Sequence, residues 1–259
     1  MIAQRMTLSL LCLAVALGLV VASPQGRLLG SEDAEMSKYP WVASLRLNKA
    51  HVCQANIISQ TQMITAAHCV SDLGTQPVPA SQLTARVGSI NQFAAGLLVD
   101  IKEVKIHPSY GNFLHDVAIL TLSQPLTFTE KINKIALPEK PEGGDELPEL
   151  PANGTPVYVT GWGEQLDGSS KYNLQKANFN TLSKSNCELA AGYGYDSVLC
   201  LSSAEKQGVC RGDDGASVVD DNGVMVGIVS FFFGNCGTKY PDVSTRISYY
   251  RDWIDANQQ

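Results

Sequence analysis

The chain has 259 residues, of which 44% are hydrophobic and 17% are charged. This composition is typical of an ordinary globular protein that can bury a substantial core, as one large domain or as two compact ones. The formal net charge of −6 and the pI near 5.2 argue against nucleic acid and anionic membranes as partners.

The N-terminus has the pattern of a secretory signal peptide. Arg5 supplies the positive end, an almost unbroken apolar run extends from Met6 to Val21, and Ala22 and Ser23 are small residues suited to cleavage. A membrane anchor is the alternative, but the run is short for a span and no basic stop signal follows it. The sequence therefore predicts a signal peptide at 1–22 and a secreted, extracellular protein.

The cysteines agree with secretion. The sequence has seven, and six remain once Cys12 leaves with the signal peptide. An even number in an oxidising compartment favours three disulfides, although fifteen pairings are possible. Zinc is the alternative, but no CxxC pair and no HxxxH spacing occurs, so we expect neither a metal nor a cofactor.

Short apolar runs rich in Val, Ile, Thr and aromatic residues alternate with turn signals along the rest of the chain, which predicts the strands of an all-β fold. A connector dense in Pro, Gly and acidic residues, at 137–154, divides these runs into similar halves. Only the final stretch, at about 248–257, has a helical pattern, with Tyr249, Trp253 and Ile254 on one face. The runs are WVASLRL, VCQANIIS, QMITAAH, LLVDIKEVKI, VAILTL, TPVYVTGW, VMVGIVSFFF and VSTRI.

The connector also contains a glycosylation sequon at Asn153, in the string Asn-Gly-Thr. Such a sequon is common on the surface loops of secreted proteins. We therefore expect a glycan at Asn153.

Two polar residues stand at the ends of apolar strands. His68 follows the run ITAA, and Asp116 directly precedes the run VAILTL. A lone histidine is more often a hydrogen-bonded, partly buried side chain, but an aspartate that enters a buried strand is costly without a partner. The natural partner is an imidazole N–H, which the carboxylate would orient. The pair therefore indicates a base and its orienting acid.

Four motifs, in order and roughly in spacing, resemble the trypsin-like serine protease family. They are TAAHC, HDVAIL, GWG at 161–163 and the Gly-Asp-x-Gly turn after Cys210. The resemblance runs from about Arg27 to the C-terminus. It implies two six-stranded antiparallel β-barrels with an active site between them, the first at about 28–137 and the second at about 154–247.

The same resemblance assigns individual residues. His68 matches the general base, Asp116 its orienting acid, Gly212 an oxyanion-hole donor, and Ser230 the serine that supports the buried acid. The implied disulfides are Cys53–Cys69, Cys187–Cys200 and Cys210–Cys236.

The sequence departs from the family at the nucleophile. The family turn reads Gly-Asp-Ser-Gly-Gly, whereas this chain has Asp214 where the serine should stand. A carboxylate has no hydroxyl proton to give to a base, and its charge lies where the oxyanion hole must receive another negative charge. It should also attract a proton onto His68. The sequence therefore predicts a catalytically inactive homologue.

The activation junction and the specificity pocket also depart from the family. Arg27 precedes Leu28-Leu29-Gly30-Ser31, which implies a propeptide at 23–27 and a new N-terminus at Leu28 that would pair with Asp213. The alternative is that Arg27 is simply a basic residue in an exposed tail.

In the specificity pocket, Gly208 matches the floor, Ser230 lies beside it, and Asp242 matches a wall position. Phe232 stands where a glycine normally admits the substrate, so the pocket is either acidic and narrow or blocked.

Two alternative uses of the Cys210 turn are weak. Arg211-Gly212-Asp213 spells the integrin-binding string, but the family assignment would bury Asp213. Calcium at Asp213 and Asp214 lacks the alternating oxygen ligands of a loop site.

The sequence therefore predicts a secreted serine protease homologue without catalysis. The resemblance extends to insect homologues that act as regulators, adaptors or decoys in protease cascades, including those of innate immunity. Its expected partners are other secreted proteins, namely proteases, zymogens or inhibitors. An active trypsin-like endopeptidase with another nucleophile is the alternative.

Overall fold

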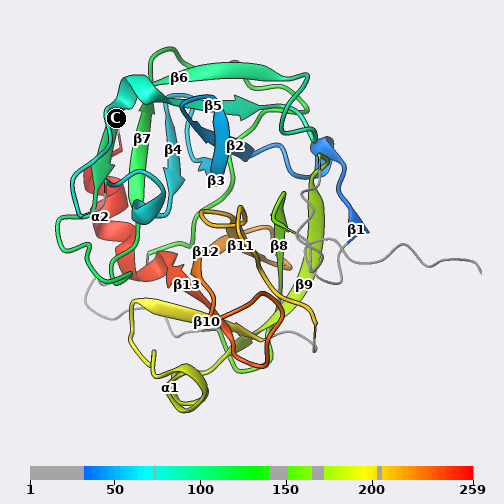
Figure 1. Cartoon of the computed structure of the whole chain (residues 1–259), viewed down its shortest axis with the longest axis vertical. Helices are drawn as coiled ribbons and strands as arrows, with labels where there is room; N and C mark the ends of the chain where they lie inside the picture. Colours follow the sequence, from blue (N-terminus) through cyan, green and yellow to red (C-terminus); the bar gives the residue numbers. More distant parts are fainter. Residues whose placement is uncertain (1–31, 73, 141–150, 165–171, 203–205, 259) are drawn as a thin grey trace, which may run out of the picture.

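A computed structural model of the chain describes residues 32–72, 74–140, 151–164, 172–202 and 206–258. Within them the chain forms two closed, antiparallel, six-stranded barrels, which lie one above the other in Figure 1. This confirms the predicted fold class. The signal peptide and propeptide ranges, with Arg27 and Leu28, lie outside the described residues. No described helix is both long and apolar enough to cross a membrane.

The first barrel closes in the order β2-β3-β4-β7-β6-β5. In β5, residues alternate between buried and half-buried, as expected where one face of a strand lines a core. In β4 and β7 every residue is buried, because the C-terminal helix covers their outer side (Figure 1). The strands are β2 Val42–Leu47, β3 Ala50–Ile57, β4 Gln62–Thr65, β5 Leu83–Val87, β6 Leu97–Ile106 and β7 Ala118–Leu122.

The second barrel follows the order β9-β10-β13-β12-β11-β8 and closes through the pairing of β8 with β9. A short strand from the start of the described chain, β1, adds to the outside of β9. The strands are β1 Glu32–Asp33, β8 Pro156–Gly161, β9 Gln175–Leu182, β10 Val198–Ser202, β11 Ser217–Asp220, β12 Met225–Phe231 and β13 Asp242–Arg246.

The C-terminal helix α2, Arg251–Ala256, follows a 3-10 turn at Ile247–Tyr250. The expected apolar face was partly wrong. Tyr250 and Ile254 are buried in the core of the first barrel, whereas Tyr249 is 37% exposed. Tyr250 and Ile254 are four residues apart, the spacing that places two side chains on one helical face.

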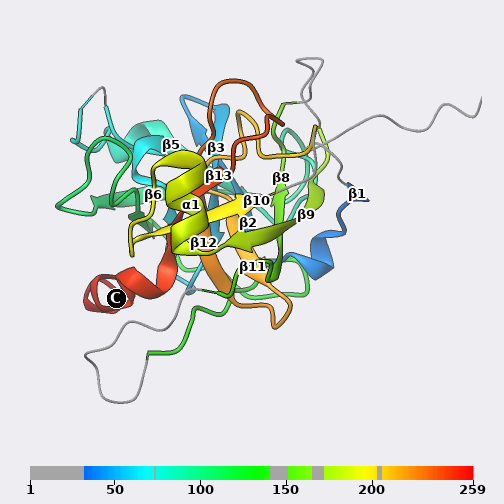
Figure 2. The same ribbon diagram turned by 90° about the horizontal axis from the view of Figure 1, so that it is seen from below.

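A second helix, α1 at Lys184–Ala191, was missing from the sequence prediction. Its signals are local. Ser183 caps the N-terminus by accepting a hydrogen bond from the Asn186 N–H, and Gly192 ends the helix in the left-handed conformation. Cys187 is its one buried residue, so the helix lacks the apolar stripe that pattern-based prediction requires. It lies at the end of the second barrel remote from the first (Figures 1 and 2).

The three predicted disulfides are present, and they are Cys53–Cys69, Cys187–Cys200 and Cys210–Cys236.

The sequon residue Asn153 is exposed, and its side-chain oxygen accepts hydrogen bonds from the Ser183 N–H and the Asn186 amide. Its glycosylation stays a prediction.

The two barrels meet where β3 contacts the turn after Cys210. The Gln54 N–H donates to the Asp214 carbonyl at 2.7 Å, and the Asn56 amide donates to the Gly215 carbonyl at 2.8 Å. Gly161, at the end of β8, lies against the same region. A Cβ atom there would lie 1.9 Å from Asp213 Oδ1. The junction therefore depends on residues without side chains.

We expect Gly161→Ala to lower the melting temperature by at least about 5 °C, because the added methyl group would overlap a fully buried carboxylate. The matched control is Gly111→Ala, since a Cβ at Gly111 would meet nothing within 4 Å. Thermal unfolding followed by circular dichroism measures both. A Gly161→Ala variant as stable as the control would contradict this packing of the barrel junction.

Candidate functional site

His68 and Asp116 meet because the strands that carry them are paired. His68 lies in a 3-10 turn just after β4, Asp116 lies just before β7, and Thr65 pairs with Ala118 between these strands. The His68 Nδ1–H donates to Asp116 Oδ2 at 2.7 Å, and the His68 backbone N–H donates to Oδ1 at 2.8 Å. The two bonds fix the ring so that Nε2 faces away from the acid.

Asp116 is fully buried and its carboxylate is well supported. The Ser230 hydroxyl donates to Oδ2 at 2.5 Å, as the family resemblance implies. The Thr245 hydroxyl donates to the Asp116 backbone carbonyl at 2.8 Å. Both hydroxyls belong to the second barrel, so the base and its acid are assembled across the barrel interface. These bonds offset much of the cost of burying the charge.

Asp214 lies in a tight turn that begins at Arg211. Gly212 and Gly215 have φ of +93° and +80°, and a Cβ at Gly215 would lie 2.2 Å from the Gln54 carbonyl. Only glycine adopts such angles freely, and at Gly215 only glycine also has the room. The two glycines therefore restrict the turn to one backbone conformation, in which residue 214 faces the cleft beside His68.

The Asp214 carboxylate occupies the donors of its own turn. Burial raises its pKa, and the charge of Asp116 raises it further. The positive charge of His68 and hydrogen bonds from the backbone N–H groups of Gly212 and Asp214 act in the opposite direction, and the pKa settles at about 6. The Gly212 N–H is the donor that the resemblance assigns to the oxyanion hole. The acid group therefore lies where a reacting oxygen would have to bind.

The charge state of His68 follows from its two acidic neighbours. Burial opposes protonation, but the charge and hydrogen bond of Asp116 outweigh it, and the charge of Asp214 adds to them, so the pKa of His68 is raised. Protonation of His68 occupies Nε2, the nitrogen that would otherwise take a proton from a nucleophile. No hydroxyl stands at position 214 to supply one.

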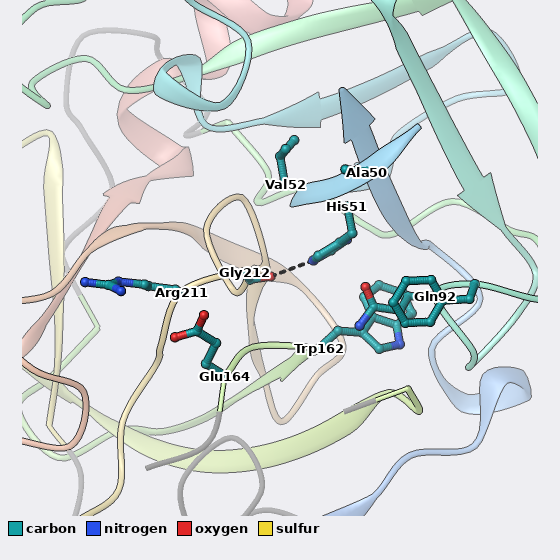
Figure 3. Close-up of a pocket in the computed structure, with 9 residues that line it drawn as sticks. Ala50, His51, Val52, Gln92, Trp162, Glu164, Arg211 and Gly212 are labelled. Atoms are coloured by element: carbon teal, nitrogen blue, oxygen red, sulfur yellow. Dashed lines mark hydrogen bonds between the residues drawn. The ribbon is translucent and has the colours of Figure 1, made fainter. Parts of the chain in front are cut away.

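His51 also contacts this turn, and it was missed in the sequence. Its Nε2 lies 3.1 Å from the Gly212 carbonyl (Figure 3). Its Nδ1 lies 2.9 Å from the Ser44 hydroxyl. Burial lowers the pKa of His51 to about 4, so the neutral ring donates from Nε2 and accepts at Nδ1. His51 lines a cavity of about 380 Å³ beside Gly212, with Ala50, Val52, Gln92, Phe93, Trp162, Glu164 and Arg211.

The predicted specificity pocket is crowded. Asp242 is 5% exposed, its Oδ2 accepts the Val209 N–H at 3.0 Å, and burial raises its pKa to about 7. The same oxygen would lie 3.3 Å from a Cβ at Gly208. Phe232 is half-buried and packs on the apolar core of the second barrel, in the group that includes Val209. The structure thus buries the acid beside Gly208 and packs Phe232 on the barrel core.

Aromatic rings continue from His68 along the second barrel. Phe113 lies 5.4 Å from the His68 ring, centroid to centroid, and 5.3 Å from Phe231, which in turn lies 5.1 Å from Tyr193. Phe113 is 46% exposed. Nothing in its local sequence marked it as a site residue.

Asp213 points away from the cleft and is fully buried. It accepts the N–H groups of Gly163 at 2.9 Å and Cys210 at 3.0 Å, and burial raises its pKa to about 8. A buried carboxylate cannot reach a receptor, which removes the integrin interpretation. Among the described residues, one cluster brings together three side chains of types that can bind a metal, Cys53, His68 and Cys69, but both sulfurs are in a disulfide.

Replacing Asp214 with Asn should lower the pKa of His68, because the variant removes a negative charge that stabilises the imidazolium. Since the folded-state pKa is raised, the stability that His68 contributes is complete below its unfolded pKa near 6.5 and is lost as pH rises through the folded pKa. NMR titration of the ring protons measures the shift. Asp100→Asn, on β6, is the control that should leave His68 unchanged, and an unchanged His68 in the Asp214 variant would refute the coupling.

Comparison with known proteins agrees with this geometry. A family model described as Trypsin matches residues 28–254. Trypsin beta of Drosophila erecta is 34% identical over 241 residues, which cover 90% of this chain and 88% of the relative. Trypsin alpha of Drosophila melanogaster is 34% identical over 238 residues, covering 88% and 86%. Neuropsin, a serine protease expressed in the limbic system of mouse brain, superposes with a TM-score of 0.76 at 22% identity, over 89% of this chain and 99% of its own. The chain belongs to the trypsin-like serine protease family.

Proposed function

We propose that the protein is a secreted, non-catalytic member of this family that acts as a regulator, adaptor or decoy in an extracellular protease cascade. Its partners would be other secreted proteins, namely proteases, their zymogens or their inhibitors. Innate immunity is the cascade that the resemblance to insect homologues favours. The activity would then be binding through the protease fold, without peptide hydrolysis.

One observation carries this proposal, the position of the Asp214 carboxylate. It replaces the hydroxyl nucleophile, the backbone N–H groups of Gly212 and Asp214 already donate to it, and it favours the protonated form of His68. Loss of a triad serine alone lowers turnover by about 10⁶-fold in a well-studied subtilisin. The residual catalysis of roughly 10³-fold over water comes from the oxyanion hole and substrate binding, and Asp214 opposes the first of these.

The crowded specificity pocket supports the same conclusion. Phe232 packs on the apolar core of the second barrel, and burial raises the pKa of Asp242 to about 7, so that near neutral pH it offers a basic side chain less than a full negative charge. A trypsin-like enzyme requires an open pocket with a fixed negative charge for Lys or Arg. This pocket supplies neither in full.

The alternative is an active secreted trypsin-like endopeptidase. The intact His68–Asp116 geometry favours it, as do relatives whose names are trypsins. Such an enzyme would need a replacement nucleophile. Ser217, the nearest serine after Asp214, is 1% exposed, and its oxygen accepts the indole N–H of Trp41 at 3.0 Å. It therefore cannot reach a substrate.

Peptide-library hydrolysis by the purified chain that begins at Leu28 tests the proposal. We expect no turnover above background for the wild type and for Phe232→Gly. We expect weak turnover for Asp214→Ser, and at least about 10³-fold more than wild type for the Asp214→Ser/Phe232→Gly double variant, in which both the nucleophile and the pocket are restored.

The control for contaminating protease is His68→Ala in the wild-type and double-variant backgrounds. Turnover by the wild type that His68→Ala abolishes would establish the active endopeptidase instead. A double variant that is silent but binds a peptide aldehyde would place the remaining obstacle in the chemistry and not in the cleft. That result would contradict the assignment of the lost chemistry to Asp214.

A further inference from the structure

The segment that leads from β6 into β7 contains a tight turn with an unfavourable backbone. Gly111 and Leu114 exchange two backbone hydrogen bonds, of 3.1 and 2.9 Å. The residues between them, Asn112 and Phe113, have φ of +49° and +59°. Asparagine tolerates this left-handed region, but a bulky residue such as phenylalanine rarely adopts it. The turn therefore depends on contacts with its surroundings to keep this conformation.

Phe113 places the turn over the cleft. Its ring lies 5.4 Å from the His68 ring and 5.3 Å from the Phe231 ring, between centroids. Two residues later the segment reaches His115, which also has a positive φ, +53°, and directly precedes Asp116. A movement of this turn would therefore uncover the His68 ring.

Two imidazole rings fasten the ends of the segment. His107 and His115 stack with their centroids 5.2 Å apart and their planes at 11°. The Tyr250 ring lies 5.2 Å from His107, and its hydroxyl lies 3.0 Å from His115 Nδ1. The Trp253 ring of α2 lies 5.1 Å from His107. The stacked rings thus attach both ends of the segment to the C-terminal turn and helix.

The hydrogen bonding requires a neutral His107. The Ser109 backbone N–H donates to His107 Nδ1 at 3.2 Å, and a backbone N–H can only donate, so Nδ1 carries no proton. Protonation of Nδ1 would break this bond and place a positive charge against the parallel ring of His115. Protonation of both rings would bring two like charges face to face. Acid therefore acts directly on the contacts that hold the turn in place.

We infer that residues 108–115 form a pH-controlled cover over the cleft beside His68. The neutral rings of His107 and His115 hold the cover closed, and their protonation releases it together with the unfavourable backbone at Phe113. The cover controls access to the cleft, so the inference does not depend on whether the cleft binds peptides or hydrolyses them. In a binding module, acidification would expose the cleft to its partner.

The carboxylates near the stacked rings have partners of their own. Asp116 follows His115 in the chain, but its carboxylate accepts its hydrogen bonds on the side of the cleft. Asp196 lines a cavity of about 270 Å³ together with His115, and its carboxylate is in an ion pair with Lys184. On α2, both acidic side chains pair with Lys140. A protonated stack would therefore gain little stabilisation from them. The titratable groups on the C-terminal turn and helix are Tyr249, Tyr250, Arg251, Asp252 and Asp255.

The pH range follows from the surroundings of His107. Burial, and then the charge of His115, lower its pKa to about 4, whereas a histidine in an open, solvated segment has a pKa of about 6.5. Because the pKa is lowered in the closed state, that state is fully favoured above pH 6.5 and loses stability as the pH falls toward 4. Between pH 7.5 and pH 5 the equilibrium should move toward the open state by about 30-fold.

Hydrogen–deuterium exchange of the purified chain at pH 7.5 and pH 5, followed by mass spectrometry and corrected for intrinsic exchange, tests the inference. Protection within residues 108–115 should fall at least about tenfold at pH 5. Protection of β12 should stay the same, which separates opening of the cover from acid unfolding. The N–H groups that report on the cover are those of Tyr110, Gly111 and Leu114, which are hydrogen-bonded in the closed state.

Two variants test the role of the imidazoles. In the His107→Asn/His115→Asn double variant, the amide oxygens can accept hydrogen bonds in place of Nδ1 but do not titrate, so the cover should stay closed at both pH values. His107→Lys places a permanent charge in the stack and should open the cover at pH 7.5. Lys105→Asn, on an exposed part of β6, is the matched control and should behave as wild type.

An NMR readout follows the cover itself. The contact between the ring protons of Phe113 and His68 should be present at pH 7.5 and lost at pH 5 in wild type, and it should persist in the double variant. Equal protection of residues 108–115 at the two pH values in wild type would overturn the inference. Opening at pH 5 that remains in the double variant would also overturn it, because another group such as His68 would then be the cause.

Discussion

The turn from Arg211 to Gly215 is held between the two barrels with almost no freedom. Gly215 N–H donates to Val229 of the second barrel, the Asp214 carbonyl accepts from Gln54 of the first, and no side chain fits at Gly215. Because the backbone is fixed from both sides, the side chain of residue 214 must enter the cleft beside His68, whatever its chemistry. A serine there would meet a base and two free N–H donors. The aspartate instead accepts those N–H groups, and its charge favours the protonated form of His68.

Three aspartates near this turn show how surroundings decide the role of the same group. Asp116 receives N–H and O–H donors from both barrels and joins them. Asp213 receives two backbone N–H groups in full burial, and its pKa rises to about 8. Asp214 accepts backbone N–H groups and lies near the charge of His68, and its pKa is about 6. The number of carboxylates in the sequence does not reveal these different roles, because each role depends on how many hydrogen-bond donors the carboxylate accepts.

The strands and the His68–Asp116 pair were accessible from the sequence because each has a local signal: alternation of apolar and polar residues, or a polar residue at the end of an apolar run. The pairing of the six cysteines came from the family resemblance, because the count alone allows fifteen pairings. The α1 helix was missed because its caps, Ser183 and Gly192, are clear but its apolar stripe is absent. Phe113 and His51 were missed for another reason. Each matters through a contact with a residue far along the chain, and no spacing within β3 reveals that His51 ends beside Gly212.

The intact His68–Asp116 pair is often read as a sign of activity, but the structure gives it a second reason to persist. Asp116 is 0% exposed and joins the barrels through Ser230 and Thr245. Loss of His68 would leave a buried carboxylate with fewer donors, a defect that costs about 3–5 kcal/mol when one partner of a buried pair is removed. A protein that no longer catalyses would therefore still be selected to keep the base and the acid. Residue 214 differs, because backbone hydrogen bonds from both barrels and the flanking glycines fix its position, so a change of its side chain leaves the course of the turn in place.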